Sequence, residues 1–227
     1  MVTAIVLAAG RSTRMGGGPN KQFIELLGKP LLWYSLAACQ QCAAVDTVVL
    51  VRRPDDAPLA ADIVREHHFG KVGAMVDGGA ERQNSVWNGL EACPAGADVV
   101  AVHDGARPLV TPALIEATIV SARRFGTGIA ATKIVDTIKE ATPERTVERT
   151  VDRTKLWAVQ TPQTAQLPLL REAYALVLGR QKIVTDEAAA VEWLGRPVHL
   201  VDTPFLNLKI TTPADLAMAE ALLRQRQ

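Results

Sequence analysis

Short runs of β-branched and aliphatic residues alternate along this chain with longer amphipathic stretches rich in Ala and Leu. The short runs predict strands, and the longer stretches predict helices. The predicted strands are Ala4–Leu7, Thr47–Val51, Gly73–Val76, Val99–His103, Gly128–Ala131, Trp157–Gln160, Val198–Val201 and Leu206–Ile210. The predicted helices are Pro30–Gln41, Ala57–His67, Glu81–Ala92, Pro112–Phe125, Leu167–Leu178, Asp186–Leu194 and Pro213–Arg224.

This alternation of strand and helix is typical of βαβ units, which form parallel sheets. We therefore expect the α/β class, as a single Rossmann-like domain over residues 1–227 with a mostly parallel sheet flanked by helices. Sheets of this kind bind ligands beyond the carboxyl ends of their strands. The residues that directly follow each predicted strand are therefore the first candidates for function.

Residues 133–156 interrupt this pattern with a segment rich in both charge signs. Apolar residues alternate with polar ones on both sides of a turn-like Ala141-Thr142-Pro143. Alternation with period two around a turn predicts a β-hairpin, and so polar a hairpin should protrude from the domain as an arm. Two interpretations stay open: a solvated excursion without a role, or an arm that contacts a partner subunit.

Composition limits the partners of this chain. The 227 residues carry a net charge of +1, so no overall field would attract nucleic acid or a membrane surface. No apolar run reaches the ~18 residues that a membrane span needs, and the three cysteines suit a reducing compartment. The sequence therefore predicts a cytoplasmic protein in which any anion is bound by a local cluster of cations.

The first predicted strand leads into the loop "LAAGRSTRMGGGPNKQF", which holds four glycines and three cations. Backbone N–H groups in a glycine-rich loop can form an anion-binding concavity, and Arg14 and Lys21 can add charge to it. The spacing fits neither the P-loop nor the dinucleotide fingerprint, because Gln22 follows Lys21 and Ser12 replaces the second glycine. The loop predicts a polyanion site of another kind; the alternative is a mobile surface loop with incidental arginines.

Two further strand ends carry candidate residues. Beyond Gly78-Gly79, Arg82 and Ser85 share a face at the start of a predicted helix, where anions are favoured. Asp104 follows a predicted buried strand and could hold Mg²⁺ together with substrate phosphates; the alternative is an Asp that caps a turn. Arg107, three residues further on, could meet a second phosphate.

Two residues in the last third of the chain complete the candidates. Lys209 lies in a predicted apolar strand, where its ammonium is costly unless it reaches an anion or a carboxylate. Thr185 is the expected N-cap of a helix whose first turn holds Asp186 and Glu187. As local structure, this N-terminus needs no functional interpretation.

The glycine-rich loop resembles the A-A-G-x-G-x-R-M…K-Q-[FY] signature of nucleotidyltransferases that join a nucleoside triphosphate to a phosphorylated sugar or polyol. Further motifs follow in matching order: G-G-x-x-R-x-x-S-V, V-H-D-G-A-R-P, D-T-I-K, V-D-R, L-W-A-V-Q-T-P-Q, T-D-E-A and N-x-K-I-T-T-P-x-D-L. Together they resemble the family of cytidylyltransferases that act on 2-C-methyl-D-erythritol 4-phosphate in the non-mevalonate isoprenoid pathway. Relatives that act on ribitol 5-phosphate tend to carry V-R-N and S-D-A where this chain has Val151-Asp152-Arg153 and Thr185-Asp186-Glu187.

The resemblance implies an enzyme that transfers a cytidylyl group from CTP to methylerythritol phosphate with Mg²⁺ as cofactor. It implies catalytic roles for Arg14, Lys21, Arg153 and Lys209. It implies substrate contacts at Ala8, Ala9, Gly10, Gly79, Arg82, Ser85, Asp104, Arg107, Thr137 and Thr185, with Asp104 next to the metal. It also implies a homodimer in which the arm crosses over, so that Arg107, Thr137 and Arg153 serve the neighbouring active site.

Two other functions stay open from the sequence. One is a cytidylyltransferase for ribitol 5-phosphate or another sugar phosphate. The other is a non-catalytic nucleotide-binding protein, which could lose the cations that stabilise a leaving group. Here all four implied catalytic cations are present, and this counts against a non-catalytic role.

Overall fold

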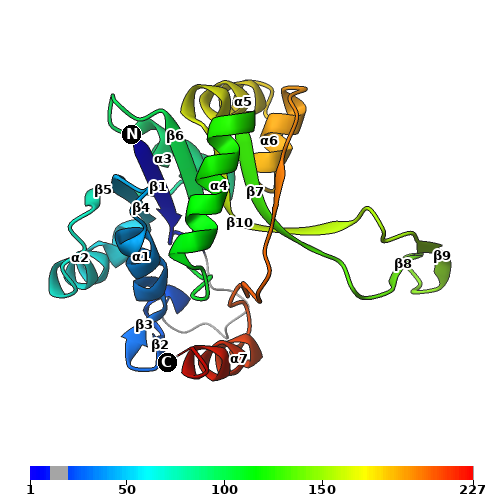
Figure 1. Cartoon of the computed structure of the whole chain (residues 1–227), viewed down its shortest axis with the longest axis horizontal. Coiled ribbons are helices and arrows are strands. Elements are labelled where there is room, and N and C mark those ends of the chain that lie inside the picture. Colours follow the sequence, from blue (N-terminus) through cyan, green and yellow to red (C-terminus); the bar gives the residue numbers. More distant parts are fainter. Residues whose placement is uncertain (11–19, 227) are drawn as a thin grey trace.

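The structure, a computed structural model, describes residues 1–10 and 20–226. Its centre is a seven-stranded sheet with the strand order β11-β7-β10-β6-β1-β4-β5 (Figure 1). The strands are β1 Val2–Leu7, β4 Thr47–Arg52, β5 Val72–Asp77, β6 Val99–Asp104, β7 Thr127–Lys133, β10 Trp157–Gln166 and β11 Leu200–Asp202. Neighbouring strands are parallel, except that β10 runs antiparallel to both β6 and β7. The predicted α/β class with a mostly parallel sheet is confirmed.

Helices cover both faces of this sheet. One face is covered by α1 Leu31–Gln41, α2 Ala57–Glu66 and α4 Pro112–Phe125. The other face is covered by α3 Arg82–Glu91, α5 Leu167–Gly179 and α6 Glu187–Trp193. Successive side chains of β1 enter the two cores alternately: Ala4 and Val6 join the first, and Ile5 and Leu7 the second. The remaining helix, α7 Pro213–Arg224, packs near the short β2 Glu25–Leu26 and β3 Lys29–Pro30 hairpin.

Local sequence signals set the helix ends where they were expected. The Thr111 side chain accepts a hydrogen bond from the Leu114 backbone N–H, Pro112 occupies the first turn, and α4 ends at Gly126 with φ 91°. At the start of α7, Thr212 and Asp215 form a reciprocal capping box. The predicted helices are therefore confirmed, with small shifts at their ends.

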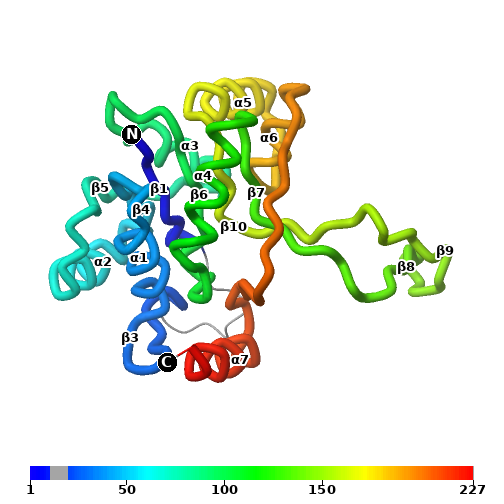
Figure 2. Tube along the Cα trace, viewed as in Figure 1, coloured from blue at the N-terminus to red at the C-terminus, as the bar shows by residue number. Residues whose placement is uncertain are grey.

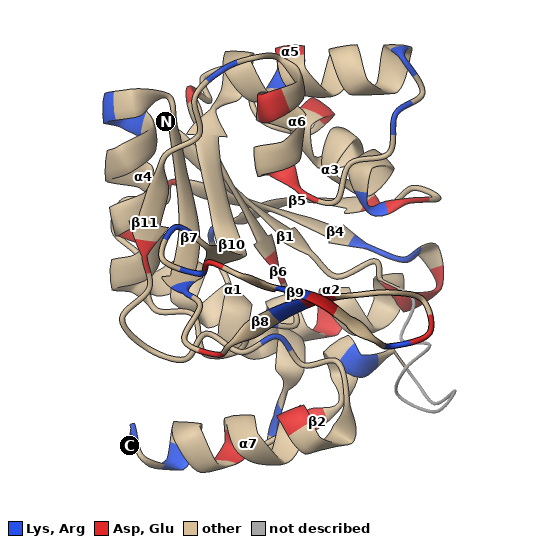
Figure 3. Cartoon of the chain, turned by 90° about the vertical axis from the view of Figure 1, so that its right-hand side faces the viewer, with Lys and Arg blue, Asp and Glu red and all other residues tan. Residues whose placement is uncertain are grey.

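The predicted hairpin is also confirmed. β8 Ile138–Ala141 and β9 Val147–Val151 pair in antiparallel fashion within the segment that joins β7 to β10. This segment, the arm, extends away from the body of the molecule (Figures 1 and 2). Most of its side chains are exposed, and both charge signs lie along it (Figure 3).

Two local predictions are wrong. Leu206–Ile210 forms no strand, because its backbone groups bond to loops and side chains instead: Asn207 O accepts from Arg107, and Ile210 N donates to Ala106 O at 2.8 Å. The N-cap of α6 is Asp186 rather than Thr185, because it is the Asp186 carboxylate that accepts a hydrogen bond from the Ala189 N–H, at 2.9 Å.

The strand order creates a crevice at one end of the sheet. β4 and β6 lie on opposite sides of β1, so the chain leaves β1 in one direction and later returns on the other side. Leu7 is in register with Asp104, so the carboxyl ends of β1 and β6 lie next to each other. Ligands bind at such a switch point in open α/β sheets. Among the described helices, none is long and apolar enough to cross a bilayer.

Candidate active site

A cleft of about 340 Å³ opens at this switch point. Its walls come from four parts of the chain: the loop after β1, the β5–α3 connection, the end of β6 and the segment before α7. The predicted site residues that line it are Ala9, Gly10, Lys21, Gly79, Arg82, Ser85, Asp104 and Lys209. Segments as far apart in sequence as Ala9 and Lys209 therefore meet around one volume.

Asp104, the last residue of β6, is the negative centre of the cleft. Its carboxylate is buried between two cations: Oδ2 lies 2.6 Å from Lys209 Nζ, and Oδ1 lies 3.3 Å from the Arg82 guanidinium. Burial alone would raise the pKa of Asp104, but the charges of Arg82 and Lys209 outweigh it and lower the pKa below its ordinary value. The prediction that Lys209 needs an anion or a carboxylate is confirmed.

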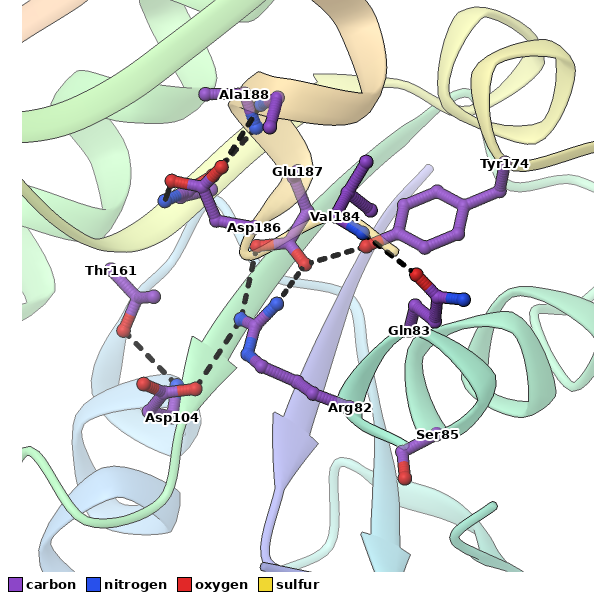
Figure 4. Close-up of polar contacts among 12 residues, drawn as sticks. Arg82, Gln83, Ser85, Asp104, Thr161, Tyr174, Val184, Asp186, Glu187 and Ala188 are labelled. Carbon is purple, nitrogen blue, oxygen red and sulfur yellow. Dashed lines mark hydrogen bonds and ion pairs between the residues drawn. The ribbon is translucent and has the colours of Figure 1, made fainter. Parts of the chain in front are cut away.

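Arg82 links Asp104 to a second buried acid (Figure 4). Its guanidinium binds both oxygens of Glu187, at 2.7 Å and 3.1 Å, while Tyr174 donates its hydroxyl to Glu187 Oε1 at 3.0 Å. Burial alone would lower the pKa of Arg82, but the carboxylates of Glu187 and Asp104 raise it. Arg82 therefore stays charged and is held in a fixed orientation.

Lys21 reaches the cleft from the other side. Its Nζ donates to the carbonyl of Ile210 at 2.8 Å, one residue from Lys209. The preceding Asn20 is buried, and its amide donates to the Asp56 carboxylate at 2.6 Å and to Ala8 O at 3.3 Å. The side chain of Asn20 thus ties the far end of the glycine-rich loop to its beginning.

The β5–α3 connection approaches the first loop unusually closely. A Cβ on Gly78 would lie 2.3 Å from the Cβ of Ala9, so only glycine fits there. The Gly79 N–H donates to Ser85 Oγ at 3.0 Å. Ala8, which precedes Ala9, is buried, and its own N–H donates to Val51 O. The groups predicted to hold the nucleoside, Ala8, Ala9, Gly79 and Ser85, therefore lie together.

Behind Asp104 lies a buried polar chain. The Asp104 N–H donates to Thr161 Oγ1 at 3.0 Å, and the Thr161 hydroxyl shares a hydrogen bond with His103 Nδ1 at 3.1 Å. Burial lowers the pKa of His103 to about 4. The adjacent Arg107 donates to the carbonyl of Asn207 at 2.7 Å. His103 is therefore a packed, hydrogen-bonded residue.

The predicted site residues Thr137, Arg153 and Thr185 do not line this cleft. Thr137 and Arg153 lie on the exposed arm, where the Arg153 guanidinium donates to Thr137 Oγ1 at 3.5 Å. Thr185 is exposed in the segment between α5 and α6. Arg14 lies outside the described residues. The roles assigned to these residues stay predictions.

A Mg²⁺ site can be tested against the donors that the chain supplies. Across residues 1–10 and 20–226, no group of three or more His, Cys, Asp or Glu side chains could hold a metal ion. Mg²⁺ in nucleotide enzymes is commonly held by one or two carboxylates, several waters and the substrate phosphates. Asp104, in a cleft lined by cations, fits that arrangement when a nucleotide supplies the other oxygens.

Several residues of the site escaped the sequence interpretation. Glu187 and Tyr174 complete the Arg82 network, and Gln83 and Gln163 bind the backbone around α6. Acids in the first turn of a helix are usually explained by the helix dipole alone. The available signal was an acid placed directly before the apolar run Ala188-Ala189-Ala190-Val191, because an acid that is buried with such a run needs a cation.

Fold and cleft together define the class: a Rossmann-like protein with cations gathered around one carboxylate at the switch point, as phosphate binding requires. Among known families, the model described as "IspD: 2-C-methyl-D-erythritol 4-phosphate cytidylyltransferase" matches residues 2–225. The chain belongs to this family of nucleotidyltransferases.

Individual relatives match this chain over nearly its whole length. The 2-C-methyl-D-erythritol 4-phosphate cytidylyltransferase of Geobacillus kaustophilus (strain HTA426) is 43% identical over 223 residues, which cover 98% of this chain and 97% of the relative. The crystal structure of 4-diphosphocytidyl-2C-methyl-D-erythritol synthase from Anaerococcus prevotii DSM 20548 matches with a TM-score of 0.85 at 30% identity, covering 98% of each chain. The crystal structure of the cytidylyltransferase from Thermus thermophilus matches with a TM-score of 0.80 at 33% identity, covering 97% of this chain and 98% of that one.

Proposed function

We propose that this protein transfers a cytidylyl group from CTP to 2-C-methyl-D-erythritol 4-phosphate and releases pyrophosphate. Family membership over residues 2–225 gives the reaction its substrates. The single observation that carries the proposal is the convergence of Lys21, Arg82 and Lys209 around Asp104 at the switch point. Such a cluster suits a reaction in which both substrates bring phosphate groups.

The reaction needs positioning and charge stabilisation more than proton transfer. A phosphate oxygen of the acceptor forms a bond to the α-phosphorus of CTP, while the bond from that phosphorus to the bridging oxygen of pyrophosphate breaks. The attacking oxygen is already anionic, so no general base is required. Catalysis then consists of in-line alignment and stabilisation of the charge that moves to the leaving group.

We propose a separate role for each cation of the cleft. We assign Lys21, at the end of the glycine-rich loop, to the α-phosphoryl group and the departing pyrophosphate, with Arg14 as its expected companion. Lys209 would exchange Asp104 for the acceptor phosphate when substrate enters. Mg²⁺, held at Asp104 with substrate oxygens, would supply further neutralisation of phosphate charge. The nucleoside would lie on Ala8, Ala9, Gly10, Gly79 and Ser85.

We further propose a homodimer in which the arm completes the acceptor site of the other subunit. Thr137 and Arg153 are exposed on the arm and lie next to each other. Both side chains are therefore accessible to a second subunit. Arg107, in contrast, donates to the carbonyl of Asn207 in its own chain and follows Asp104 by three residues, so we assign it to the cleft of its own subunit. Thr185 would face the acceptor from the start of α6.

We expect the enzyme to act in the cytoplasm. All three cysteines, Cys39, Cys42 and Cys93, are buried as free thiols. Burial raises the pKa of Cys39 to about 12 and of Cys93 to about 11, so neither thiol is in its reactive thiolate form near neutral pH. A reducing compartment suits such a set.

Product analysis tests the proposal directly. The purified chain is incubated with CTP, Mg²⁺ and one acceptor at a time: 2-C-methyl-D-erythritol 4-phosphate, ribitol 5-phosphate or glucose 1-phosphate. We expect a cytidine diphosphate conjugate and stoichiometric pyrophosphate with the first acceptor, at a kcat/KM at least tenfold above the others. A preference for ribitol 5-phosphate would replace the proposed acceptor, and no pyrophosphate with any acceptor would overturn the enzymatic function.

A further inference from the structure

The segment between α5 and α6 is held by side chains rather than by strand pairing. Residues 182–186 have no helix or strand conformation. They are nevertheless bound from two directions, by Gln83 of α3 and by Gln163 of β10, while Tyr174 of α5 binds Glu187 directly after them (Figure 4). We call this set the α6 clamp; it consists of Arg82, Gln83, Gln163, Tyr174 and Glu187.

Gln83 holds the first part of the segment. Its amide nitrogen donates to Lys182 O at 3.1 Å, and its amide oxygen accepts from the Val184 N–H at 2.9 Å. A single side chain thus satisfies both backbone groups that a neighbouring strand would otherwise bind. Gln83 is 8% exposed, so water does not readily replace it.

Gln163 holds the second part in the same way. It donates to Asp186 Oδ2 at 3.0 Å and accepts from the Ala188 N–H at 2.9 Å. Gln163 is buried on β10, two residues beyond the Thr161 that bonds to Asp104. The strand that supports Asp104 therefore also fixes the start of α6.

The ion pair between Glu187 and Arg82 closes the clamp. Glu187 is 1% exposed, and a buried carboxylate is costly unless it is paired and fully hydrogen-bonded. Arg82 binds both of its oxygens, and Tyr174 adds a third hydrogen bond. Because Arg82 and Gln83 are adjacent, the first turn of α3 faces the cleft with one residue and holds the 182–184 segment with the next.

Thr185 is the exposed residue between these fixed points. We infer that the α6 clamp is a positioning device for the acceptor: Gln83 and Gln163 fix the 182–188 segment, and so fix Thr185 relative to Asp104 and Lys209. This inference rests on the proposed function. It assigns to two glutamines, which touch no substrate, control over the affinity for the phosphorylated polyol but not for CTP.

Two variants test the clamp, with a matched control. Gln83→Met and Gln163→Met keep side-chain length but remove the donor and the acceptor. Gln40→Met is the control, because Gln40 accepts from the Lys71 N–H at 3.0 Å in a part of the fold remote from α6. Hydrogen exchange of the peptide spanning 182–188 and pyrophosphate-release kinetics are measured for each variant and the original chain.

We expect faster exchange at 182–188 and a KM for methylerythritol phosphate raised at least tenfold in both clamp variants, with the KM for CTP within twofold. Gln40→Met should change none of these. The inference is overturned if exchange accelerates without a change in the acceptor KM, if exchange is unchanged, or if both KM values rise together. If the original chain makes no product, the proposed function and the acceptor role fall together, and exchange alone decides whether the glutamines hold the segment.

Discussion

The ion pairs of the cleft and of the arm differ in burial and in the sequence distance between their partners. In the cleft, Asp104 and Glu187 are buried and bind cations more than twenty residues away, so each bond joins distant parts of the fold. In the arm, Glu140 and Arg149 are exposed and form an ion pair across one hairpin. Among the interactions described for the arm, Lys139 to Thr150 and Arg153 to Thr137 are equally local.

This contrast separates two kinds of contribution. Loss of one partner from a buried pair leaves an uncompensated charge and destabilises the fold, and pairs between distant elements also fix the geometry of the site. Exposed pairs within a hairpin contribute little to folding, because solvent screens them and long side chains lose entropy on pairing. The arm should therefore contribute little to stability; under the proposed shared active site it should still matter for activity, whereas the cleft should matter for both.

Deletion of Ala141–Arg149 should have the largest effect on activity and almost none on folding. We expect cytidylyl transfer to fall to background while the melting temperature of the remaining domain stays within a few degrees. Kinetics, calorimetry and light scattering for the molecular mass check this. A monomeric deletion variant with full activity would refute the shared active site.

Glu187→Ala removes a buried ion pair of the cleft and should destabilise the fold. Removal of one partner from a buried ion pair leaves Arg82 with Asp104 as its remaining acidic partner, and such losses cost about 3–5 kcal/mol of unfolding free energy. Urea denaturation measures this loss. A cost below about 1 kcal/mol would show that solvent reaches Arg82 and that the pair is not truly buried.

Lys21→Ala should lower kcat without unfolding the chain. By analogy with removal of a donor that stabilises transition-state charge, we expect a loss of ~3 kcal/mol, or roughly a hundredfold in kcat. Lys71→Ala is the matched control, because Lys71 also donates to a backbone carbonyl, that of Cys42 at 2.7 Å, but far from the cleft. A decrease below twofold for Lys21→Ala would exclude the assigned role.

The comparison also predicts where pH sensitivity resides. Burial lowers the pKa of His103 to about 4 from an ordinary value of 6.5, so between these values the unfolded chain binds a proton that the folded chain does not. The contribution of neutral His103 to the free energy of unfolding is therefore fully present above pH 6.5. It decreases as the pH falls towards 4, by about 3 kcal/mol in total. Urea denaturation at several pH values should show this decrease flattened in His103→Asn and retained in His68→Asn, where the side chain is exposed. An unchanged slope in His103→Asn would assign the sensitivity to other groups.

The smallest effect belongs to the exposed pair of the arm. Replacing Glu140 and Arg149 together by Ala should change the unfolding free energy by less than ~0.5 kcal/mol. The same denaturation experiment measures it. A loss comparable to that of Glu187→Ala would mean that the arm is not the independent element that its exposure indicates.

Most of the fold follows from patterns that are local in sequence. Period-two alternation identified the arm, and caps such as Thr111 and Thr212 set the helix ends. The prediction of a strand at Leu206–Ile210 was wrong because the alternation of apolar and polar residues there has another cause. Ile210 packs under α7, while Lys209 extends to Asp104. Alternation with no neighbouring strand to bind does not produce a strand.

The site residues that directly follow strands were predictable from the sequence. Those that are needed because they bind a side chain distant in sequence were not. Asp104, Lys21 and Gly79 lie where the switch-point rule expects them. Glu187 and Gln163 could not be found in this way, because their partners lie 105 and 23 residues away along the chain. Such partnerships exist only once the tertiary structure has formed.

β10 joins these two regions, and its pairing with β7 shifts register between Val159 and Gln163. Its first residues, Trp157 to Gln160, are largely accessible at the base of the arm, and Thr161 to Ala165 are buried in the sheet. A partner that binds the arm would therefore bind a segment that continues directly into the strand carrying Thr161 and Gln163. Thr161 and Gln163 hydrogen-bond to Asp104 and Asp186, so a displacement of this strand would reach both the cleft and the start of α6.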